Sequence, residues 1–396
     1  MSDERRREPP GELRGDAYRD PGLVAALAGR VRAAASELGR PLKLMHICGT
    51  HEHALGRYAL RDLLPPELSL LAGPGCPVCV CDSALIDAAV RLALRPGVVV
   101  ASFGDMLAVP GSLPLRGEGK GDVRMSLESA RAQGGEVRAV TSVFEAGRLA
   151  AETPESEVVF FSVGFETTVV ATAALLRRDP PPNLSILEAN YYTPPATAML
   201  PSLPGFDVDG LLLPGHATAV TGTGVYDGLP ALGISCAVAG FEPADILAAV
   251  SAVLRQLLEG RPRIDNAYPR VVSRQGNPRA LAELAEVFEA TPRRWRGIAD
   301  IDASGFDLRP AYRQRSARAR FPDAFTAEGA SAREHPAGCR CAEVTLGQVT
   351  PDACALFGGR CTPDNPYGPC MVSHEGTCRA WQQYGMARGR IAVRTA

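Results

Sequence analysis

Residues 158–168 read Val-Val-Phe-Phe-Ser-Val-Gly-Phe-Glu-Thr-Thr, and the pattern in this stretch decides the fold. The apolar run at 158–163, rich in β-branched and aromatic residues, is typical of a buried strand. Gly164 follows, and Glu166-Thr167-Thr168 can open a helix, because an acidic side chain in the first turn compensates the helix dipole. A strand that passes directly into a helix is the beginning of a βαβ unit.

The same alternation of strand and helix recurs on both sides of this stretch. The predicted strands are 42–47, 68–72, 98–103, 137–141, 158–163, 184–189, 208–213 and 234–238, and the clearest helices are 23–38, 247–258 and 280–290. Such a pattern predicts parallel sheet covered on both faces by helices. We therefore expect an α/β fold with two doubly wound parallel-sheet halves and a C-terminal, loop-rich iron-sulfur region.

The expected domains follow from these elements. They are a leader and helix (1–40), a first α/β domain (41–150), a second α/β domain (151–270) and a C-terminal helical and cluster domain (271–396). The two doubly wound halves would thus divide near residue 150.

Composition excludes several classes of protein. The 396 residues are 46% hydrophobic and 22% charged, as in a soluble globular protein, and the formal net charge of -2 gives no reason to expect nucleic acid or an anionic membrane as partner. No apolar run is long enough to span a bilayer, and the charged start of the chain does not resemble a signal peptide. We expect a cytoplasmic protein, in which eleven cysteines are better explained by metal ligands and redox thiols than by structural disulfides.

Chemically useful residues follow several predicted strands. The strand ends carry Cys48-Gly-Thr-His51-Glu52, Gly73-Pro-Gly-Cys76-Pro-Val-Cys79, Gly104-Asp105, Gly164-Phe-Glu166-Thr-Thr168 and Pro214-Gly-His216. In open α/β sheets, ligand sites form outside the carboxyl ends of the strands, so we expect these motifs to converge on one crevice. Glu166 is explained equally well by helix capping, and His216 is expected to face the crevice. The chain has neither a P-loop nor a GxGxxG after a strand, so the fold does not here imply a nucleotide.

Cys48 stands where a strand meets a helix, and N–H groups at a helix start stabilise a thiolate. This predicts a reactive cysteine. His51 and Glu52 follow within one helical turn and could serve the sulfur as second ligand, proton carrier or hydrogen-bond partner. A buried structural cysteine beside a helix N-cap is the alternative.

Cys76 and Cys79 form a CxxC motif between glycines and a short apolar run. Two cysteines at this spacing can close a disulfide or hold a metal. Zinc would need a second pair nearby, and only Cys81 is close, so a redox pair is favoured. Cys81 and Cys236 have no motif around them and are interpreted as small packing residues.

Six of the eleven cysteines lie in the loop-rich tail between Cys339 and Cys378. Four of them, Cys339, Cys354, Cys361 and Cys378, offer thiolates at a spacing that suits either tetrahedral zinc or a cubane iron-sulfur cluster. The remaining pair, Cys341 and Cys370, favours redox work, in which a dithiol exchanges electrons with a cluster. A disulfide-stapled tail would require an oxidising compartment, which nothing else indicates.

Taken in order, these motifs resemble the NiFe-hydrogenase maturation factor HypD family over residues 20–385. The matching stretches are CGTHE (48–52), GPGCPVCV (73–80), FGDMLAVPGS (103–112), GFETT (164–168), PGH (214–216), AGFEPADIL (239–247), YPRVV followed by GN (268–277) and CALFGGRCTPDNPYGPCMVSHEGTC (354–378). The chain departs from the family at Asn190-Tyr191-Tyr192, where many members have Asn-His, and at Ala217-Thr218 after PGH.

The resemblance implies a scaffold on which the Fe(CN)2CO unit of the hydrogenase is assembled, in complex with a HypC-type small chaperone and with cyanide from a HypE-type donor. It implies that Cys48 holds the iron together with the N-terminal cysteine of the chaperone, beside His51 and Glu52, and that Cys76 and Cys79 are a redox dithiol near that iron. It implies that Cys339, Cys354, Cys361 and Cys378 bind a 4Fe-4S cluster, with Cys341 and Cys370 as a second dithiol. Electrons would then pass from the cluster through thiols to the iron.

Two other functions remain open from the residues alone. One is a cluster-dependent protein disulfide reductase, in which the CxxC and tail thiols would suffice without Cys48. The other is a structural zinc protein, which metal and acid-labile sulfide analysis would identify. The basic run of Arg313, Arg315, Arg318 and Arg320 lacks interleaved aromatic residues and is interpreted as a solvated face or a partner contact, not a nucleic-acid site.

Overall fold

Two sheets form the frame of the molecule in the computed structural model, which describes residues 15–115, 123–331 and 333–385. The five-stranded sheet has the order β2-β1-β7-β8-β9, and all its strands are parallel. Its strands are β1 (Leu42–His46), β2 (Leu68–Ala72), β7 (Gly210–Pro214), β8 (Ser235–Ala239) and β9 (Ile264–Asn266). The predicted α/β class with parallel sheets is confirmed.

The six-stranded sheet has the order β10-β11-β6-β5-β3-β4. Its strands are β3 (Val98–Ser102), β4 (Glu136–Ala139), β5 (Glu157–Gly164), β6 (Leu184–Tyr191), β10 (Phe288–Trp295) and β11 (Ala299–Leu308). The first four are parallel, and the β10–β11 hairpin extends the sheet antiparallel to β6.

All eight predicted strands are present; strand 68–72 is unchanged, and the ends of the others shift by at most two residues. The sheets, however, do not divide near residue 150 as expected. β1 and β2 join β7, β8 and β9 in one sheet. In the other sheet β3 pairs with β5, from beyond residue 150, and β4 pairs with β3 at the edge. Hydrophobic runs indicate where strands lie but not which strands pair, so this exchange could not be predicted from the sequence.

The β10–β11 hairpin was not predicted. The predicted helix 280–290 is α11 (Pro278–Val287), and residues 288–290 instead begin β10. Phe288 and Trp295 are buried between exposed residues of β10. The pairing register with β11 shifts between Thr291 and Arg293, around Pro292. Proline and two arginines hide the alternation that would otherwise indicate a strand.

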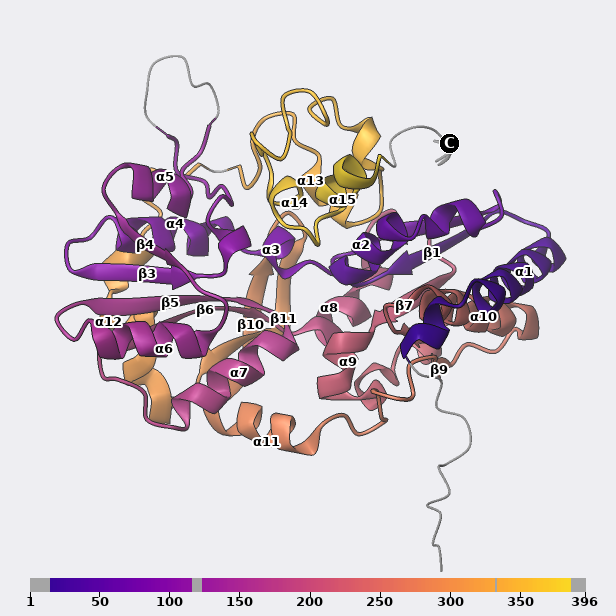
Figure 1. Cartoon of the computed structure of the whole chain (residues 1–396), viewed down its shortest axis with the longest axis horizontal. Helices are drawn as coiled ribbons and strands as arrows, with labels where there is room; N and C mark the ends of the chain where they lie inside the picture. Colours follow the sequence, from indigo (N-terminus) through magenta and orange to yellow (C-terminus); the bar gives the residue numbers. More distant parts are fainter. Residues whose placement is uncertain (1–14, 116–122, 332, 386–396) are drawn as a thin grey trace, which may run out of the picture.

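Successive residues of β5 point to opposite faces of the six-stranded sheet. Val159 and Phe161 pack with α4 (Ser83–Ala93) and α5 (Leu127–Ala132), whereas Val158 and Phe160 pack on the other side with α6 (Val143–Glu152), α7 (Glu166–Leu176) and α11. Figure 1 shows these two helical layers above and below the sheet. The five-stranded sheet is covered on one face by α1 (Pro21–Leu38) and α10 (Pro243–Glu259).

The remaining helices carry or surround the candidate site. They are α2 (Gly49–Arg57), α3 (Pro77–Val80), α8 (Thr193–Met199), α9 (Gly215–Thr221), α12 (Ala317–Arg320), α13 (Cys341–Thr345), α14 (Pro369–Val372) and α15 (Thr377–Tyr384). In Figure 1 the tail that contains α13, α14 and α15, in yellow, lies over α2 and α3. The tail thus joins the two sheets on one side of the molecule.

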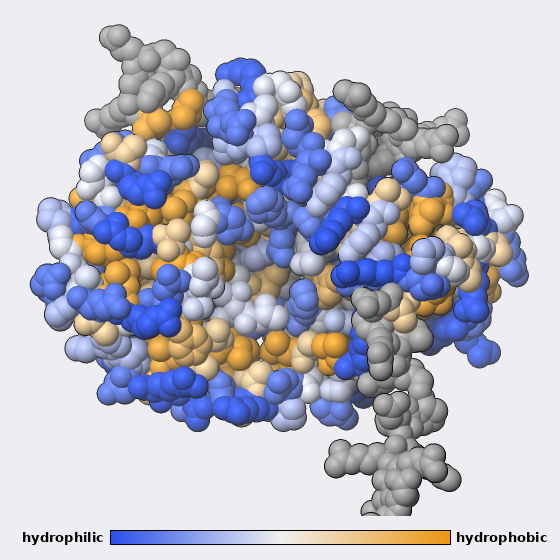
Figure 2. Space-filling view, viewed as in Figure 1, coloured by the Kyte–Doolittle hydropathy of each residue, from blue (hydrophilic) through white to orange (hydrophobic). Residues whose placement is uncertain are grey.

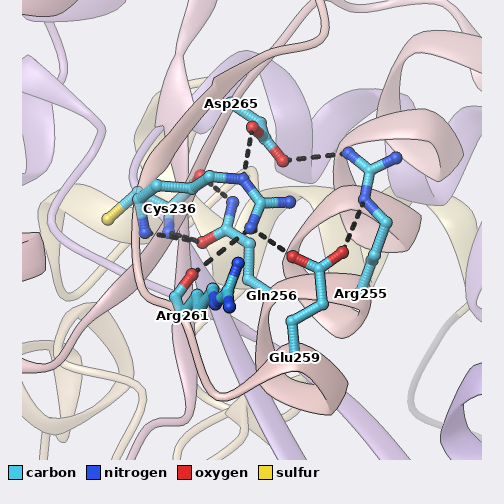
Figure 3. A network of polar contacts seen from close by, with 7 residues as sticks. Cys236, Arg255, Gln256, Glu259, Arg261 and Asp265 are labelled. Carbon is cyan, nitrogen blue, oxygen red and sulfur yellow. Dashed lines mark hydrogen bonds and ion pairs between the residues drawn. The ribbon is translucent and has the colours of Figure 1, made fainter.

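Cys236 is a packing residue, as predicted. It is fully buried in β8, and the Gln256 side chain accepts from its backbone N–H and donates to its carbonyl oxygen. Gln256 Oε1 also accepts from the Arg263 backbone, so α10 is tied to the segment before β9 (Figure 3). The surrounding ion pairs of Arg263 with Glu259 and Asp265 complete a purely structural network.

Two arginines of the basic run serve the fold and not a solvated face. Arg315 is buried and donates to the carbonyl oxygens of Pro180 and Pro181, and Arg320 donates to Glu157. Hydrophilic and apolar residues intermingle over the face seen in Figure 2. Within the described ranges, no helix has the length and apolar character needed to cross a membrane.

Candidate functional site

Cys48 connects β1 to α2 and is buried, with an extended backbone at the N-cap position of α2. The backbone N–H of Gly49 donates to Gly75 O at 2.7 Å. A Cβ on Gly75 would lie 2.1 Å from the Cys48 nitrogen, so only glycine allows this approach. The loop that carries Cys76 therefore packs directly on the backbone of Cys48.

The thiol of Cys48 is not the ready thiolate that the helix start suggested. Burial and the charge of Glu375 raise its pKa to about 12, and N–H groups of Thr50 and His51 only partly oppose this. Thr50 Oγ1 donates to Glu375 Oε1 at 2.7 Å, which fixes the carboxylate near the cysteine. The helix N-terminus is present, but desolvation outweighs it.

His51 is fully buried in the first turn of α2. Its Nε2–H donates to the carbonyl oxygens of Gly240 and Ala239, at 3.0 and 3.3 Å, and its Nδ1 has no hydrogen-bond partner in the described part of the chain. Burial and the nearby His46 lower the pKa of His51 to about 3. His51 is therefore a neutral imidazole with one free lone pair.

Glu52 does not reach the sulfur but is the centre of a buried polar network. It accepts from His46 Nε2 at 2.7 Å, from Arg61 at 2.8 Å and from Trp381 Nε1 at 2.9 Å. Burial would raise the pKa of Glu52, but the charge of Arg61 and the hydrogen bond from His46 overcome this and lower the pKa to about 2. His46 Nδ1 in turn lies 3.1 Å from the Cys48 carbonyl oxygen. Glu52 thus positions the Cys48 backbone and is not poised as a ligand.

Cys76 and Cys79 are joined as a disulfide across the start of α3, with Cα atoms 5.3 Å apart. Both side chains are buried, at 4% and 3% exposure, in one hydrophobic cluster with Met371 and the tail cysteines. The redox-capable pair therefore faces the tail and not the solvent.

The tail cysteines gather around one small pocket. It is lined by Cys339, Cys341, Cys354, Cys361, Cys370 and Cys378, together with Arg340, Val344, Leu356, Phe357, Gly368 and Met371. Thiol contacts link Cys339 to Cys341, Cys341 to Cys370 and Cys370 to Cys378. Sequence spacing had grouped these residues, and the fold brings all six together.

The chemistry of this pocket fits a soft metal or an iron-sulfur cluster, because sulfur donors are enclosed by apolar walls. The sulfur positions are nevertheless those of thiols that contact one another, and no group of three or more His, Cys, Asp or Glu side chains that could hold a metal ion occurs among the described residues. The contact with Cys341 and burial raise the pKa of Cys339, and burial raises the pKa of Cys361. Ligation would therefore have to replace protons held by these thiols.

The structure brings together most of the predicted strand-end motifs. Asp105 accepts from Ser373 of the tail at 3.1 Å, and its charge acts on Glu375 beside Cys48. His216 is exposed and stacks on Phe241, whose ring also packs against His51. Glu166 lies elsewhere.

Glu166 accepts from the backbone N–H and the hydroxyl of Thr193, at 2.7 and 2.8 Å. Its other oxygen, Oε2, has no hydrogen-bond partner in the described ranges, and burial raises the pKa of Glu166 to about 7. Glu166 is the acidic residue in the first turn of α7, as the capping interpretation expected, and it also binds α8 through Thr193, while a site role stays a prediction.

Sequence reasoning missed three residues around Cys48, namely His46, Glu375 and Trp381. His46 is hidden in a strand, where an imidazole at an inward position carries no motif. Glu375 and Trp381 lie more than 300 positions from their partners Thr50 and Glu52. The only available signal was their nearness to Cys378 in the sequence.

The chain is similar to known hydrogenase maturation proteins over nearly its whole length. A family model described as "HypD: Hydrogenase formation hypA family" matches residues 22–385. The hydrogenase maturation factor HypD of Rhodobacter capsulatus is 40% identical over 380 residues, which cover 94% of this chain and 98% of that protein.

More distant organisms carry similar proteins. HypD of Escherichia coli is 37% identical over 381 residues, covering 93% of this chain and 97% of that protein. A putative hydrogenase expression/formation protein of Methanocaldococcus jannaschii is 37% identical over 371 residues, covering 92% and 98%. The chain therefore belongs to the HypD family of hydrogenase maturation factors.

Proposed function

We propose that this maturation factor is the scaffold on which the Fe(CN)2CO unit of a NiFe hydrogenase is assembled, and that Cys48 holds the iron as cargo. The observation that carries the proposal is the direct packing of the loop before the Cys76–Cys79 disulfide on the Cys48 backbone, which brings the two cysteine-bearing segments into contact. A thiolate suits low-spin iron with cyanide and carbonyl ligands better than a carboxylate would.

The residues around Cys48 support this role. Its thiol is protonated in the free protein, so binding of iron must displace the proton. His51 Nδ1 is the one imidazole lone pair that the described residues leave free in this helix turn, and as a neutral imidazole it can bind the metal. Glu52 and His46 keep the Cys48 carbonyl in place while this happens.

The proposal extends to partners and to a resident cofactor. A HypC-type small chaperone would supply a second cysteine to the iron and a HypE-type protein the cyanide, in the cytoplasm. Cys339, Cys354, Cys361 and Cys378 would hold a 4Fe-4S cluster, which supplies single electrons when bound. Cys341 and Cys370, already in contact, would act as a dithiol beside it, and Cys76 with Cys79 as the dithiol beside the iron.

A second candidate is a cluster-dependent protein disulfide reductase, which the Cys76–Cys79 disulfide favours. Its burial speaks against this reading, because a protein substrate would have to reach sulfurs that the tail covers. The scaffold explains both the disulfide and the position of Cys48.

Infrared spectroscopy tests the proposal directly. The chain is co-expressed with the chaperone and the cyanide donor and purified without oxygen, beside C48A and the matched control C236A, which removes a buried cysteine outside the site. We expect cyanide and carbonyl bands in the wild type and in C236A, and their loss in C48A. If the wild type lacks these bands while iron and sulfide are bound, the disulfide reductase replaces the scaffold.

A further inference from the structure

The tip of the β10–β11 hairpin is wedged beneath the tail. The backbone N–H of Arg296 donates to Val80 O at 2.9 Å, next to Cys81. At Gly297, where φ is +71°, a Cβ would lie 2.6 Å from the Cβ of Ala342, the neighbour of Cys341. The Arg296 side chain is 1% exposed. A guanidinium is therefore buried between the segment after the CxxC motif and the first helix of the tail.

Arg296 is bonded to neutral oxygens. Nη1 donates to Pro110 O at 2.8 Å, and Nε and Nη2 donate to Glu334 O at 3.1 and 2.6 Å. The carboxylate of Glu334 is turned away, towards Arg294 and the Gly297 N–H. Within the described residues no carboxylate pairs with Arg296.

Two other buried arginines of the chain have such partners. Arg293 pairs with Asp307, and Arg315 pairs with Asp179. A buried charge without an opposite charge is costly, and proteins rarely keep one unless something neutralises it. Arg296 thus has no carboxylate hydrogen-bonded to it among the described residues, and the charge of Asp82 acts on it only through space.

The groups near Arg296 that can become negative are the carboxyl of Asp82 and several thiols. Burial lowers the pKa of Arg296, and Cys341, Cys81 and Cys339 lie close enough to oppose this shift when ionised. Cys339 and Cys341 also both contact the Gly368 position, with their Sγ atoms 2.9 and 3.7 Å from a Cβ built there. Two of the sulfurs that line the pocket therefore lie next to one another and within electrostatic range of Arg296.

His335 adds no negative charge. Both of its ring nitrogens lack partners in the described chain, and burial together with Arg296 lowers its pKa to about 3. Arg124, also buried, donates to the His335 and Arg333 carbonyl oxygens and adds positive charge. The positive charges of Arg296 and Arg124 would therefore stabilise negatively charged sulfur in this part of the tail.

We propose that Arg296 is the buried counter-charge of the thiolate-ligated group held by Cys339 and its neighbours, and that it raises the reduction potential of that group. The inference rests on the proposed cluster. Reduction adds one negative charge, and a nearby cation in a medium of low dielectric constant stabilises the more negative state. Arg296 is thus a positioning residue for electron transfer and binds no substrate itself.

A potentiometric titration tests this. Wild type, R296Q, R296M, R296K and the control R315Q, which removes another buried arginine bonded to carbonyl oxygens, are loaded without oxygen with ferrous iron and sulfide. Iron and sulfide are measured first, and each protein is then titrated with dithionite and followed by visible absorbance and electron paramagnetic resonance. We expect R296Q and R296M to lower the equilibrium constant of one-electron reduction about tenfold, which is about 59 mV. R296K and R315Q should stay close to the wild type.

The outcomes separate the two proposals. A wild type that binds no iron and sulfide removes the cluster, and with it both the electron-transfer role and this inference. If R296Q and R296M bind iron and sulfide and have the reduction potential of the wild type, the inference is overturned and the proposed function stays intact. If R296Q and R296M fail to fold even before loading while R315Q folds, Arg296 serves the fold alone, which also overturns the inference.

Discussion

The residues that surround Cys48 show how environment decides what a side chain does. Both His51 and Glu52 follow Cys48 within one turn, but buried Glu52 is saturated by three donors, whereas His51 keeps a free Nδ1. The sequence indicated that His51 and Glu52 lie close to Cys48, but it could not assign a role to either side chain. Those roles depend on Arg61 and Trp381, which carry no motif.

Glu166 is a buried residue whose charge state makes the stability of the fold depend on pH. Its carboxyl is buried, and burial raises its pKa from 4.5 to about 7. In the unfolded chain the same carboxyl loses its proton near pH 4.5. Its contribution to stability is therefore fully present below pH 4.5 and is lost as the pH rises through 7.

We predict that E166Q gains stability relative to the wild type as the pH rises. Glutamine cannot ionise, so the difference in free energy of unfolding between variant and wild type should shift in favour of E166Q by ~2–3 kcal/mol between about pH 5 and pH 8. Urea unfolding at both pH values measures this. E152Q, which changes an exposed glutamate of α6, should show the same difference at both. A pH-independent difference for E166Q would show that its carboxyl does not titrate in this range.

At the scale of elements, the site depends on how closely two loops approach. The β1–α2 connection and the loop after β2 touch through Gly75, which leaves no room for a Cβ beside Cys48. β1 and β2 are adjacent and parallel, so their carboxyl ends deliver both loops to the same edge of the sheet. This juxtaposition was predictable from the strand pattern, but the backbone contact was not.

We expect G75A to destabilise the protein by ~2–3 kcal/mol, because backbone atoms at 2.1 and 2.4 Å cannot move aside as a flexible side chain would. Co-purified iron should fall with it, since the two loops would separate. G29A is the matched control, because nothing lies within 4 Å of the added Cβ in the middle of α1, and alanine there should stabilise by ~0.5–1 kcal/mol. Urea unfolding and iron analysis of both variants decide the matter, and equal behaviour would refute the close contact.

At the scale of the whole molecule, the sheets are built from distant parts of the chain. β1 is completed by β7, and β3 by β5, so neither sheet is finished before residue 150. The tail then closes the cluster formed by α4, β5 and the CxxC loop. The molecule therefore has no break at the boundary that the sequence suggested.

A fragment of residues 1–150 should accordingly fail to fold. It would leave β1 and β3 with unpaired edges and without the apolar partners of β5 and β7. We expect no cooperative urea transition and strong binding of a hydrophobic dye, in contrast to the full chain measured in parallel. A fragment with a cooperative transition and dispersed amide resonances would mean that the first half is an independent domain after all.

Strand positions were predictable because both faces of strands such as 158–163 are buried, which makes the whole run apolar. Such a run can be recognised without knowing which strand it pairs with. The pairing of β1 with β7 could not be predicted, because it depends on the path of the chain between them. The β10–β11 hairpin could not be predicted either, because β10 contains Pro292 and two arginines. The six tail cysteines were found from spacing alone. Glu375 and Arg296, which set the charge around Cys48 and the tail thiols, become visible only when the chain is folded.

The contacts of the tail with α2 have a consequence for the order of synthesis. The ribosome makes Thr50 and Glu52 early, but their partners Glu375 and Trp381 follow 325 and 329 residues later. The surroundings of Cys48 cannot be complete on a nascent chain until the tail has emerged. Cys48 thus acquires its final environment only after Trp381 has been made, so that products truncated before that residue lack a finished site.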